Sequence, residues 1–177
     1  HRHTDGSLGL GSGWLTEVLP LQGSPSLRLR RNSSFHLPVA PAPMLLIGNG
    51  TGLAGLRSLL KARISEGEQR NWLLFGERNR ASDLLCADEL QGWLARGELR
   101  KLDLAFSRDQ AEKVYVQDLL LAQPDEVRRS VADGACIYVC GSLQGMAAAV
   151  DAALRGILGE AMLQQLVEDG RYRRDVY

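Results

Sequence analysis

The chain has 177 residues, 45% of them hydrophobic, and its 21 Lys and Arg residues balance its 21 Asp and Glu residues. A chain of this length can bury one good core, and the neutral balance removes any global electrostatic argument for binding nucleic acid or an anionic membrane. No apolar stretch approaches the roughly 20 residues of a membrane span and no secretory leader pattern opens the sequence, so we expect no membrane contact by this chain.

The first 43 residues differ in pattern from the rest. A small-residue loop at 6–13 runs into a short apolar patch at 14–15, and residues 26–31 alternate as in a strand with one solvent-exposed face. Three prolines then mark a linker. One or two strands cannot build a core of their own, so we expect this segment to be the end of a domain whose other part lies elsewhere.

From Met44 onward, strand and helix patterns alternate. Apolar runs typical of buried strands lie at 44–47, 72–75, 102–106 and 137–139, and amphipathic segments lie at 53–64, 82–95, 114–122 and 144–158. Strands joined by helical crossovers form a parallel sheet, so we predict an α/β fold with three layers and helices on both faces. Such sheets bind ligands beyond the carboxyl ends of their strands. The candidate site segments are therefore 48–52, 76–79, 107–109 and 140–142.

The first of these segments carries the clearest motif. The run at 44–47 ends in Gly48-Asn49-Gly50-Thr51-Gly52 and leads into a helical pattern. A strand that feeds a helix through glycines presents bare N–H groups and the positive end of a helix dipole to an anion, so we expect a phosphate here and hence a nucleotide ligand. The alternative to a ligand site is that the tight turn needs glycine for steric reasons alone.

Two nucleotide-binding classes compete for this motif. Residues 50–55 spell G-x-G-x-x-G, and Glu77 follows the next predicted strand, where an ordinary Rossmann dehydrogenase places the acid that binds the ribose. No Gly-Lys-Ser/Thr follows the loop, which excludes a Walker-type site. The segments after the strands also carry Arg78 and the pair Ser107 and Arg108, which suit a phosphorylated cofactor. Polar residues follow strands in any case, because loops are solvated.

Cysteine and histidine give no sign of a metal site. Cys86, Cys136 and Cys140 are too few and too poorly spaced for a zinc site or a disulfide scaffold. Cys136 and Cys140 fall in one predicted strand about 13 Å apart, and a disulfide needs Cα atoms within about 7 Å. Free cysteines favour a reducing compartment, so we expect a cytoplasmic protein. His1 and His3 are interpreted as an untidy chain start.

Six blocks in residues 44–177 carry a family resemblance. They are GNGTGLA (48–54), NWLLFG (71–76), DLAFSRDQ (103–110), KVYVQD (113–118), IYVCG (137–141) and RYRRDVY (171–177). In this order they resemble the ferredoxin–NADP reductase superfamily, in its diflavin reductase branch, and most closely the family of sulfite reductase flavoprotein subunits. The resemblance implies that residues 44–177 bind NADPH and deliver its hydride to FAD, from which electrons pass to an acceptor protein or domain.

The resemblance also implies which residues hold NADPH. Ser107 and Arg108 match the pair that holds the 2′-phosphate, and a hydroxyl beside a guanidinium suits a dianionic phosphate. Lys113 would add charge there, Tyr115 would stack on adenine, and Gln117 would complete that pocket.

Other matching residues surround the pyrophosphate. Gly50, Thr51 and Gly52 form the glycine loop, with the Thr51 hydroxyl near the pyrophosphate and the nicotinamide ribose. Arg78 aligns with an arginine that contacts the pyrophosphate in some relatives. These assignments rest on the resemblance and add to the anion-binding argument made from the loop itself.

The catalytic residues that the resemblance implies lie near the end of the chain. Cys140 matches the cysteine beside the nicotinamide C4, although a small buried hydrophobe at a strand end is its alternative role. Asp175 resembles the acidic partner at that site. Tyr177 resembles the aromatic that stacks over the flavin and must move aside for nicotinamide. Near the other end, Gly9, Leu10, Gly11 and Ser12 resemble the loop that meets the FAD phosphate and ring.

The chain departs from the family in informative ways. Most of the FAD barrel, including its Arg-x-Tyr-Ser motif, and the whole FMN domain are missing. We therefore expect this chain to be part of a larger flavoprotein, and expect the chain by itself to be inactive and to bind FAD poorly. Residues 1–43 would be the remnant of an antiparallel β flavin-binding barrel plus a linker. Ala149 stands where a close relative has a nucleotide-contacting aspartate, and Asn49 and Gly55 replace prolines common in the loop and helix start.

Three functions remain open at this point. The first is the NADPH-binding domain of a flavin-dependent reductase, whose parent could carry FMN or attach to the cytoplasmic face of a membrane. The second is a self-contained NAD(P)-dependent dehydrogenase, and the third is a non-catalytic NADP(H)-sensing module. The first places cofactor choice at Ser107 and Arg108, whereas the second places it at Glu77.

Overall fold

The structure is a computed structural model that describes residues 6–26, 28 and 32–177. It divides into two compact units, His1–Arg31 and Asn32–Tyr177. The described part of the first unit holds the short helix α1 (Leu10–Gly13), continued by the π-helical turn η1 (Trp14–Val18). Helix α1 therefore stands in the second half of the loop that the sequence predicted over 6–13. The strand predicted at 26–31 lies mostly outside the described residues, so the barrel remnant stays a prediction.

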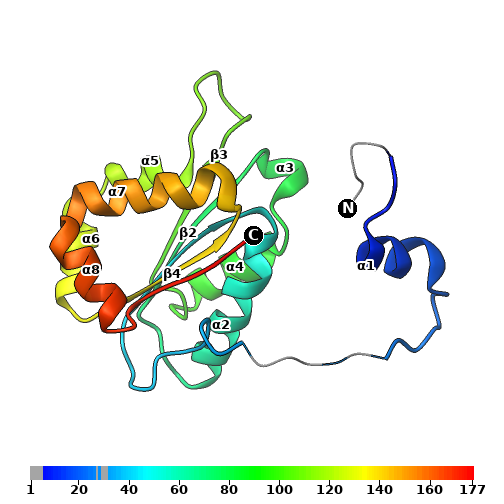
Figure 1. The fold of residues 1–177 in the computed structure, drawn as a ribbon, viewed down its shortest axis with the longest axis horizontal. Helices are drawn as coiled ribbons and strands as arrows, with labels where there is room; N and C mark the ends of the chain where they lie inside the picture. Colours follow the sequence, from blue (N-terminus) through cyan, green and yellow to red (C-terminus); the bar gives the residue numbers. More distant parts are fainter. Residues whose placement is uncertain (1–5, 27, 29–31) are drawn as a thin grey trace. The chain divides into compact units, whose positions relative to one another are not determined.

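The second unit is built on a five-stranded parallel sheet (Figure 1). Its strands are β1 (Met44–Asn49), β2 (Asn71–Glu77), β3 (Lys101–Phe106), β4 (Cys136–Gly141) and β5 (Tyr172–Val176). Their order is β3-β2-β1-β4-β5, and every neighbouring pair is parallel. The chain builds outward from β1 to β3 and then crosses to the other side of β1, so the strand order reverses between β1 and β4. A ligand crevice is expected at this switch point.

Helices cover both faces of the sheet, as the sequence predicted. One face packs on α2 (Leu53–Ser65) and α4 (Ala87–Ala95). The other packs on α5 (Val116–Leu121), α6 (Pro124–Ala132), α7 (Ala148–Leu158) and α8 (Glu160–Glu168). Successive β1 residues alternate between the two cores, with Met44 and Leu46 on the α2 side and Leu45 and Ile47 on the α7 side.

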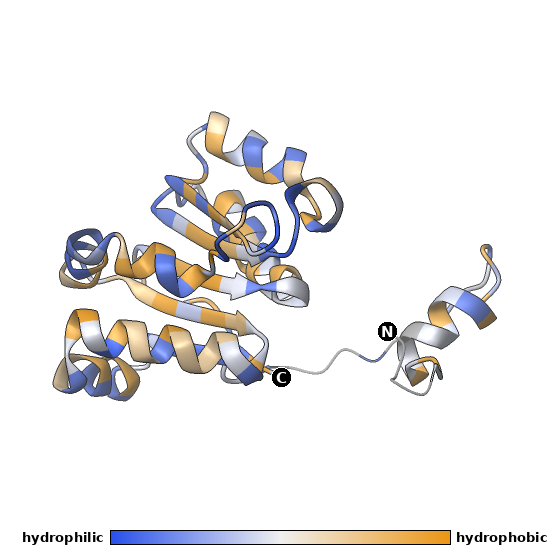
Figure 2. Cartoon of the chain, turned by 90° about the horizontal axis from the view of Figure 1, so that it is seen from above, coloured by the Kyte–Doolittle hydropathy of each residue, from blue (hydrophilic) through white to orange (hydrophobic). Residues whose placement is uncertain are grey.

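The surface pattern of the helices agrees with this three-layer arrangement. Hydrophobic and hydrophilic residues alternate along the helices in Figure 2, as expected when one side of each helix is buried. All four predicted strands are present, and the three-layer α/β prediction is confirmed. None of the described helices combines the length and the apolar character that crossing a membrane requires.

Two of the predicted helices are interrupted. The helix predicted over 82–95 is in fact α3 (Arg80–Asp83) followed by α4, because Leu84 leaves the helical region with ψ 89° and Cys86, just before α4, adopts a left-handed φ of +59°. The helix predicted over 144–158 begins with the turn η3 (Leu143–Ala147), in which Gln144 and Gly145 have non-helical dihedrals, and becomes regular at α7.

The end of the predicted linker packs on the sheet. Phe35 is buried and meets the Tyr138 ring edge to face, with ring centroids 5.4 Å apart. The Tyr138 hydroxyl donates a hydrogen bond to the His36 carbonyl at 2.7 Å. Residues 35 and 36 are therefore part of the α/β unit, while the assignment of residues 1–43 to a flavin-binding domain stays a prediction.

Candidate functional site

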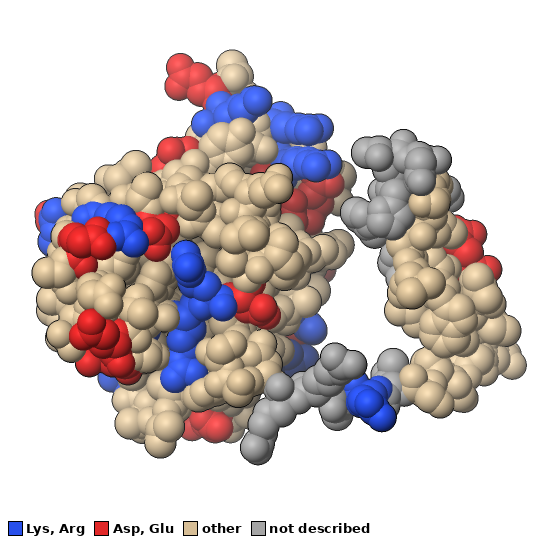
Figure 3. Space-filling view, viewed as in Figure 1, with Lys and Arg blue, Asp and Glu red and all other residues tan. Residues whose placement is uncertain are grey.

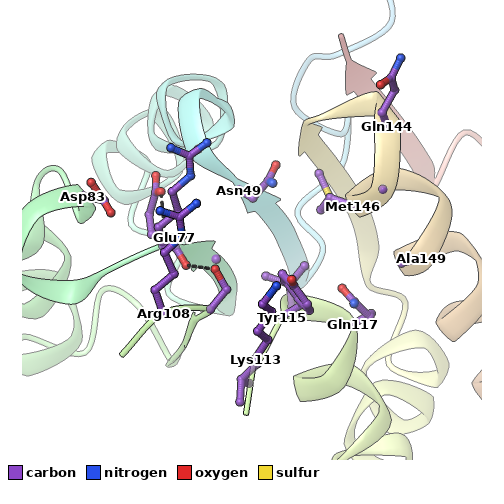
Figure 4. A pocket seen from close by; sticks show the side chains of 17 residues that line it. Asn49, Glu77, Asp83, Arg108, Lys113, Tyr115, Gln117, Gln144, Met146 and Ala149 are labelled. Carbon is purple, nitrogen blue, oxygen red and sulfur yellow. Dashed lines mark hydrogen bonds between the residues drawn. The ribbon is translucent and has the colours of Figure 1, made fainter. Parts of the chain in front are cut away.

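A pocket of about 720 Å³ opens at the carboxyl ends of β1, β2 and β3 and beside the loop after β4 (Figure 4). Its lining includes seven of the predicted cofactor-binding residues, namely Gly50, Arg78, Ser107, Arg108, Lys113, Tyr115 and Gln117. These residues come from three separate loops, and the parallel sheet brings the loops together because its strands all end on one side.

The glycines of the loop after β1 have two different roles. A Cβ atom on Gly48 or Gly52 would lie 2.4 or 2.1 Å from the Cys140 carbonyl oxygen, so packing against β4 requires glycine at both positions. Gly50 differs, because it has φ +55°, nothing within 4 Å of its Cβ position, and a place in the pocket lining. The steric explanation therefore accounts for Gly48 and Gly52, while Gly50 leaves the backbone open to a ligand.

The pocket holds three cations, Arg78, Arg108 and Lys113, together with two carboxylates, Glu77 and Asp83. Among the described residues, no ion pair involves Arg78, Arg108 or Lys113, whereas most other Arg and Lys side chains pair with Asp or Glu. Nearby, the Arg80 guanidinium lies 4.4 Å from the centre of the Phe106 ring. Figure 3 shows Lys and Arg gathered over α3 and the loop after β3. This part of the pocket is suited to an anion.

The ends of β2 and β3 are hydrogen-bonded to each other. The Ser107 N–H donates to the Glu77 carbonyl at 3.0 Å, and the Arg108 N–H donates to the Arg78 carbonyl at 2.9 Å. Burial raises the pKa of the Glu77 carboxyl above its ordinary value, despite a hydrogen bond from the Arg78 N–H. The two rival positions for cofactor choice are thus neighbours in one pocket.

The start of α5 forms the apolar part of the pocket. The Tyr115 ring is 44% exposed, and its backbone N–H donates to the Asp118 carboxylate at 2.8 Å, which fixes the beginning of the helix. Val114 and Val116 line the pocket on either side of it. An exposed aromatic ring beside cations can stack on a planar base.

The predicted catalytic residues lie at the switch point and outside the lining of this pocket. Cys140 and Asp175 are register partners on β4 and β5. Cys140 is 2% exposed, and burial, with a smaller effect from Asp175, raises the pKa of its thiol to about 11. The Tyr177 hydroxyl lies 2.7 Å from the Thr51 hydroxyl. The structure therefore brings these four residues together in two pairs.

The predicted FAD-contacting residues belong to the first unit. Gly9 precedes α1, and Leu10, Gly11 and Ser12 lie in it. Leu10 is 95% exposed. Their contact with FAD stays a prediction. Within the described residues, no group of three or more His, Cys, Asp or Glu is arranged to hold a metal ion.

Some lining residues were predicted only as members of the segments 48–52 and 76–79, namely Asn49, Gly76 and Glu77. The lining residues that belong neither to the predicted site residues nor to a predicted site segment are Asp83, Val114, Val116, Gln144, Gly145, Met146 and Ala149. The predicted site segments contain only residues directly after a strand, and the last of them ends at residue 142. The kink at Gln144 and Gly145, with φ +89° at Gly145, brings the residues that follow it into the pocket as well.

The sheet, its switch point and the open glycine loop define the class of dinucleotide-binding α/β domains. Residues 46–152 match the oxidoreductase NAD-binding domain family, and the chain belongs to this family. The superfamily resemblance indicated by the six sequence blocks is thereby confirmed.

Three curated relatives support the same placement. The chain is similar to the sulfite reductase (NADPH) flavoprotein alpha-component of Salmonella typhimurium, with 40% identity, and to the proteins of the same name from Mannheimia succiniciproducens and Neisseria meningitidis serogroup C, with 38% identity each. Each alignment covers 96% of this chain and 30% of the relative. The chain thus spans less than a third of the length of these relatives.

Proposed function

We propose that this chain is the NADPH-binding part of a flavin-dependent reductase, in which NADPH supplies a hydride to FAD. The observation that carries the proposal is the group formed by Arg78, Arg108 and Lys113 in the segments after β2 and β3, which line one pocket and form no ion pair with any described residue. NADPH differs from NADH by a dianionic 2′-phosphate, and such a group is best held by charge-assisted hydrogen bonds. Membership of an oxidoreductase NAD-binding family and relatives named as NADPH flavoproteins support it.

The residues of the pocket fit NADPH. Ser107, Arg108 and Lys113 would hold the 2′-phosphate, with the hydroxyl and the two cations as donors. Arg78 and the open backbone at Gly50 would meet the pyrophosphate. Tyr115 would stack on adenine, and Gln117, the next residue but one, would contact the edge of the base.

The nicotinamide is proposed to lie at the switch point, beside Cys140 and Asp175. The raised pKa keeps the Cys140 thiol protonated, so it would present a small, neutral, polarisable group to the ring. Asp175, the register partner of Cys140 on the edge strand, would supply negative charge that favours a positively charged nicotinamide. Both residues would orient the ring and set its polarity.

The flavin and the electron acceptor belong to the activity of the whole protein. The relatives are named flavoproteins, and we propose that FAD is held mainly by the part of their length that this chain does not span, with Tyr177 and residues 9–12 as this chain's contacts. FMN would belong to a further domain. Electrons would pass to an acceptor protein or domain, in the cytoplasm, where Cys86, Cys136 and Cys140 would stay free as the structure has them.

Cofactor discrimination by Arg108 is the direct test. In the 177-residue chain, we expect Arg108→Ala to weaken NADPH binding by roughly 10- to 150-fold, because charged hydrogen bonds contribute about 1.5–3 kcal/mol. NADH binding should change by less than about 2-fold, since NADH lacks the group that Arg108 contacts. Isothermal titration calorimetry measures both. Arg96→Ala, which removes an exposed arginine paired with Glu98, is the matched control. Equal losses for the two cofactors would contradict the proposal.

A self-contained dehydrogenase is the second candidate, because Glu77 lines the same pocket at the position of a ribose-binding acid. In that case Glu77→Gln would weaken NADH binding at least tenfold and Arg108→Ala would spare it. The visible spectrum of the whole protein separates the candidates further, since flavin absorption bands fit only the reductase.

A further inference from the structure

A closed path of hydrogen bonds joins the glycine loop, the loop after β4 and Tyr177. The Ser142 N–H donates to Asn49 Oδ1 at 2.9 Å. The Leu143 N–H donates to the Tyr177 carbonyl at 2.9 Å. The Tyr177 hydroxyl lies 2.7 Å from the Thr51 hydroxyl, which returns the path to the glycine loop two residues after Asn49. The tyrosine is thus held at both its backbone and its side chain.

The local backbone is shaped for this arrangement. Gly141 has φ +136°, and a Cβ atom there would lie 2.3 Å from Asn49 Oδ1, so only glycine leaves room for the carboxamide oxygen. The Tyr177 N–H donates to the Gly141 carbonyl at 3.1 Å. Figure 4 places Asn49 at the end of β1, between Glu77 on one side and Met146 on the other. The anchor of Tyr177 is therefore continuous with the wall of the pocket.

The contact between the two hydroxyl groups has a preferred direction. A phenol is more acidic than an alcohol, so the Tyr177 O–H is the better donor and the Thr51 oxygen the better acceptor. The single Thr51 proton is then free for another acceptor. A chain of such bonds strengthens when its last member meets an anion, because each bond polarises the next.

We propose that Tyr177 is a positioning residue whose hydroxyl orients the Thr51 hydroxyl as a donor to the cofactor phosphate at the glycine loop. This rests on the proposed function, because the phosphate belongs to the nucleotide that the pocket binds. Tyr177 acts through Thr51 and needs no contact with the phosphate. The ring of Tyr177 and its hydroxyl thus have separable effects, and replacement by phenylalanine isolates the hydroxyl.

Two ligands that differ by one phosphate test this inference. 2′-AMP carries only the phosphate assigned to Ser107 and Arg108, whereas 2′,5′-ADP adds the 5′-phosphate that the glycine loop would bind. In the 177-residue chain, Tyr177→Phe should weaken 2′,5′-ADP binding by about 2- to 10-fold, the range for one hydrogen bond, and leave 2′-AMP binding unchanged. Tyr172→Phe is the matched control, since it removes a tyrosine hydroxyl on β5 that donates to Asp151 instead.

A double-mutant cycle distinguishes positioning from a general structural effect. In Thr51→Val, whose side chain cannot accept or donate, a further Tyr177→Phe change should not alter 2′,5′-ADP affinity, whereas independent roles would give additive losses. Additive losses, or an equal loss for both ligands, would overturn the inference. Failure of 2′-AMP to bind the unmodified chain would instead overturn the proposed function, so the two failures are distinguishable.

Discussion

Two surface pockets of this protein contain charged side chains, but the charges are arranged differently. In the pocket of about 430 Å³ between α7, α8 and β5, each ionised group has a partner. Arg155 pairs with Asp151 at 2.7 Å and with Glu160, and Arg174 lies 3.7 Å from Asp151. In the pocket at the strand ends, Arg78, Arg108 and Lys113 have no such partner among the described residues.

We infer from this difference which charges stabilise the fold and which are available to a ligand. A paired cation has its donors occupied and contributes modestly to stability. An unpaired cation contributes little to the fold and keeps all its donors available for an incoming anion. The volumes of the two pockets do not show which one binds a ligand. The pairing of their charges distinguishes them.

Charge reversal in the two pockets should give the largest contrast. We expect Arg108→Glu to weaken 2′,5′-ADP binding by more than about 100-fold, because a charged hydrogen bond becomes a repulsion, with the midpoint of thermal unfolding nearly unchanged. Arg155→Glu should do the opposite, lowering that midpoint and sparing the affinity. Calorimetric titration and thermal denaturation of both variants provide the measurements. Loss of affinity in Arg155→Glu would show that the two pockets are not functionally distinct.

Neutralising the shared acid of the smaller pocket should have a moderate effect on stability. Asp151→Asn leaves Arg155 and Arg174 without their common counter-charge but keeps an oxygen for the Tyr172 hydroxyl. We expect the free energy of unfolding in urea to fall by about 1 kcal/mol. Glu112→Gln, in the exposed loop after β3, is the control and should leave it unchanged. Unchanged stability in Asp151→Asn would contradict a structural role for the paired charges.

The smallest effect is expected at Glu77, which lines the same pocket as Arg78, Arg108 and Lys113 and whose pKa is raised by burial. Because the folded pKa of Glu77 lies above its unfolded value, its ionised form opposes folding at neutral pH, and this opposition disappears as the carboxyl becomes protonated. Glu77→Gln should therefore raise the midpoint of thermal unfolding at pH 7, and the difference should vanish below the ordinary value of 4.5.

Glu89 provides the opposite case for the same pH series. A hydrogen bond from Arg57 holds the pKa of Glu89 below its ordinary value, so its ionised form favours folding. Glu89→Gln should lower the unfolding midpoint at pH 7, and the difference should shrink as the pH falls through the lowered pKa. A shift of the same sign in both variants would contradict the assigned directions.

Three of the four strands that the sequence predicted lie inside the sheet, and the fourth, β3, is an edge strand whose apolar residues at 102 and 104–106 still gave a signal. β1, β2 and β4 are apolar runs because helices cover them on both sides, and this burial leaves a clear signal. β5 was missed, since it is an edge strand with Arg173, Arg174 and Asp175 at its centre. Such charges protect an edge and conceal it from a hydrophobicity pattern. Helix α6 was also missed, although Pro124 at its first turn and two following acids are start signals.

The sequence predicted those site residues that directly follow a strand. Arg78, Ser107 and Arg108 do so, and because the carboxyl ends of parallel strands meet at one edge of the sheet, they were expected in one pocket. Met146 and Gln144 enter through a kink that depends on tertiary packing, which a local pattern does not reveal. The hydrogen bond between Thr51 and Tyr177 spans 126 positions in sequence, and only the folded chain discloses it.

The burial of Cys140 has a consequence for chemical durability. With a pKa of about 11, only about one thiol in several thousand is ionised near neutral pH, and peroxides and alkylating agents attack the ionised form. Cys86, by contrast, is exposed to solvent. Oxidation of cysteine in this protein should therefore begin at Cys86, and the Cys140 thiol should be oxidised more slowly.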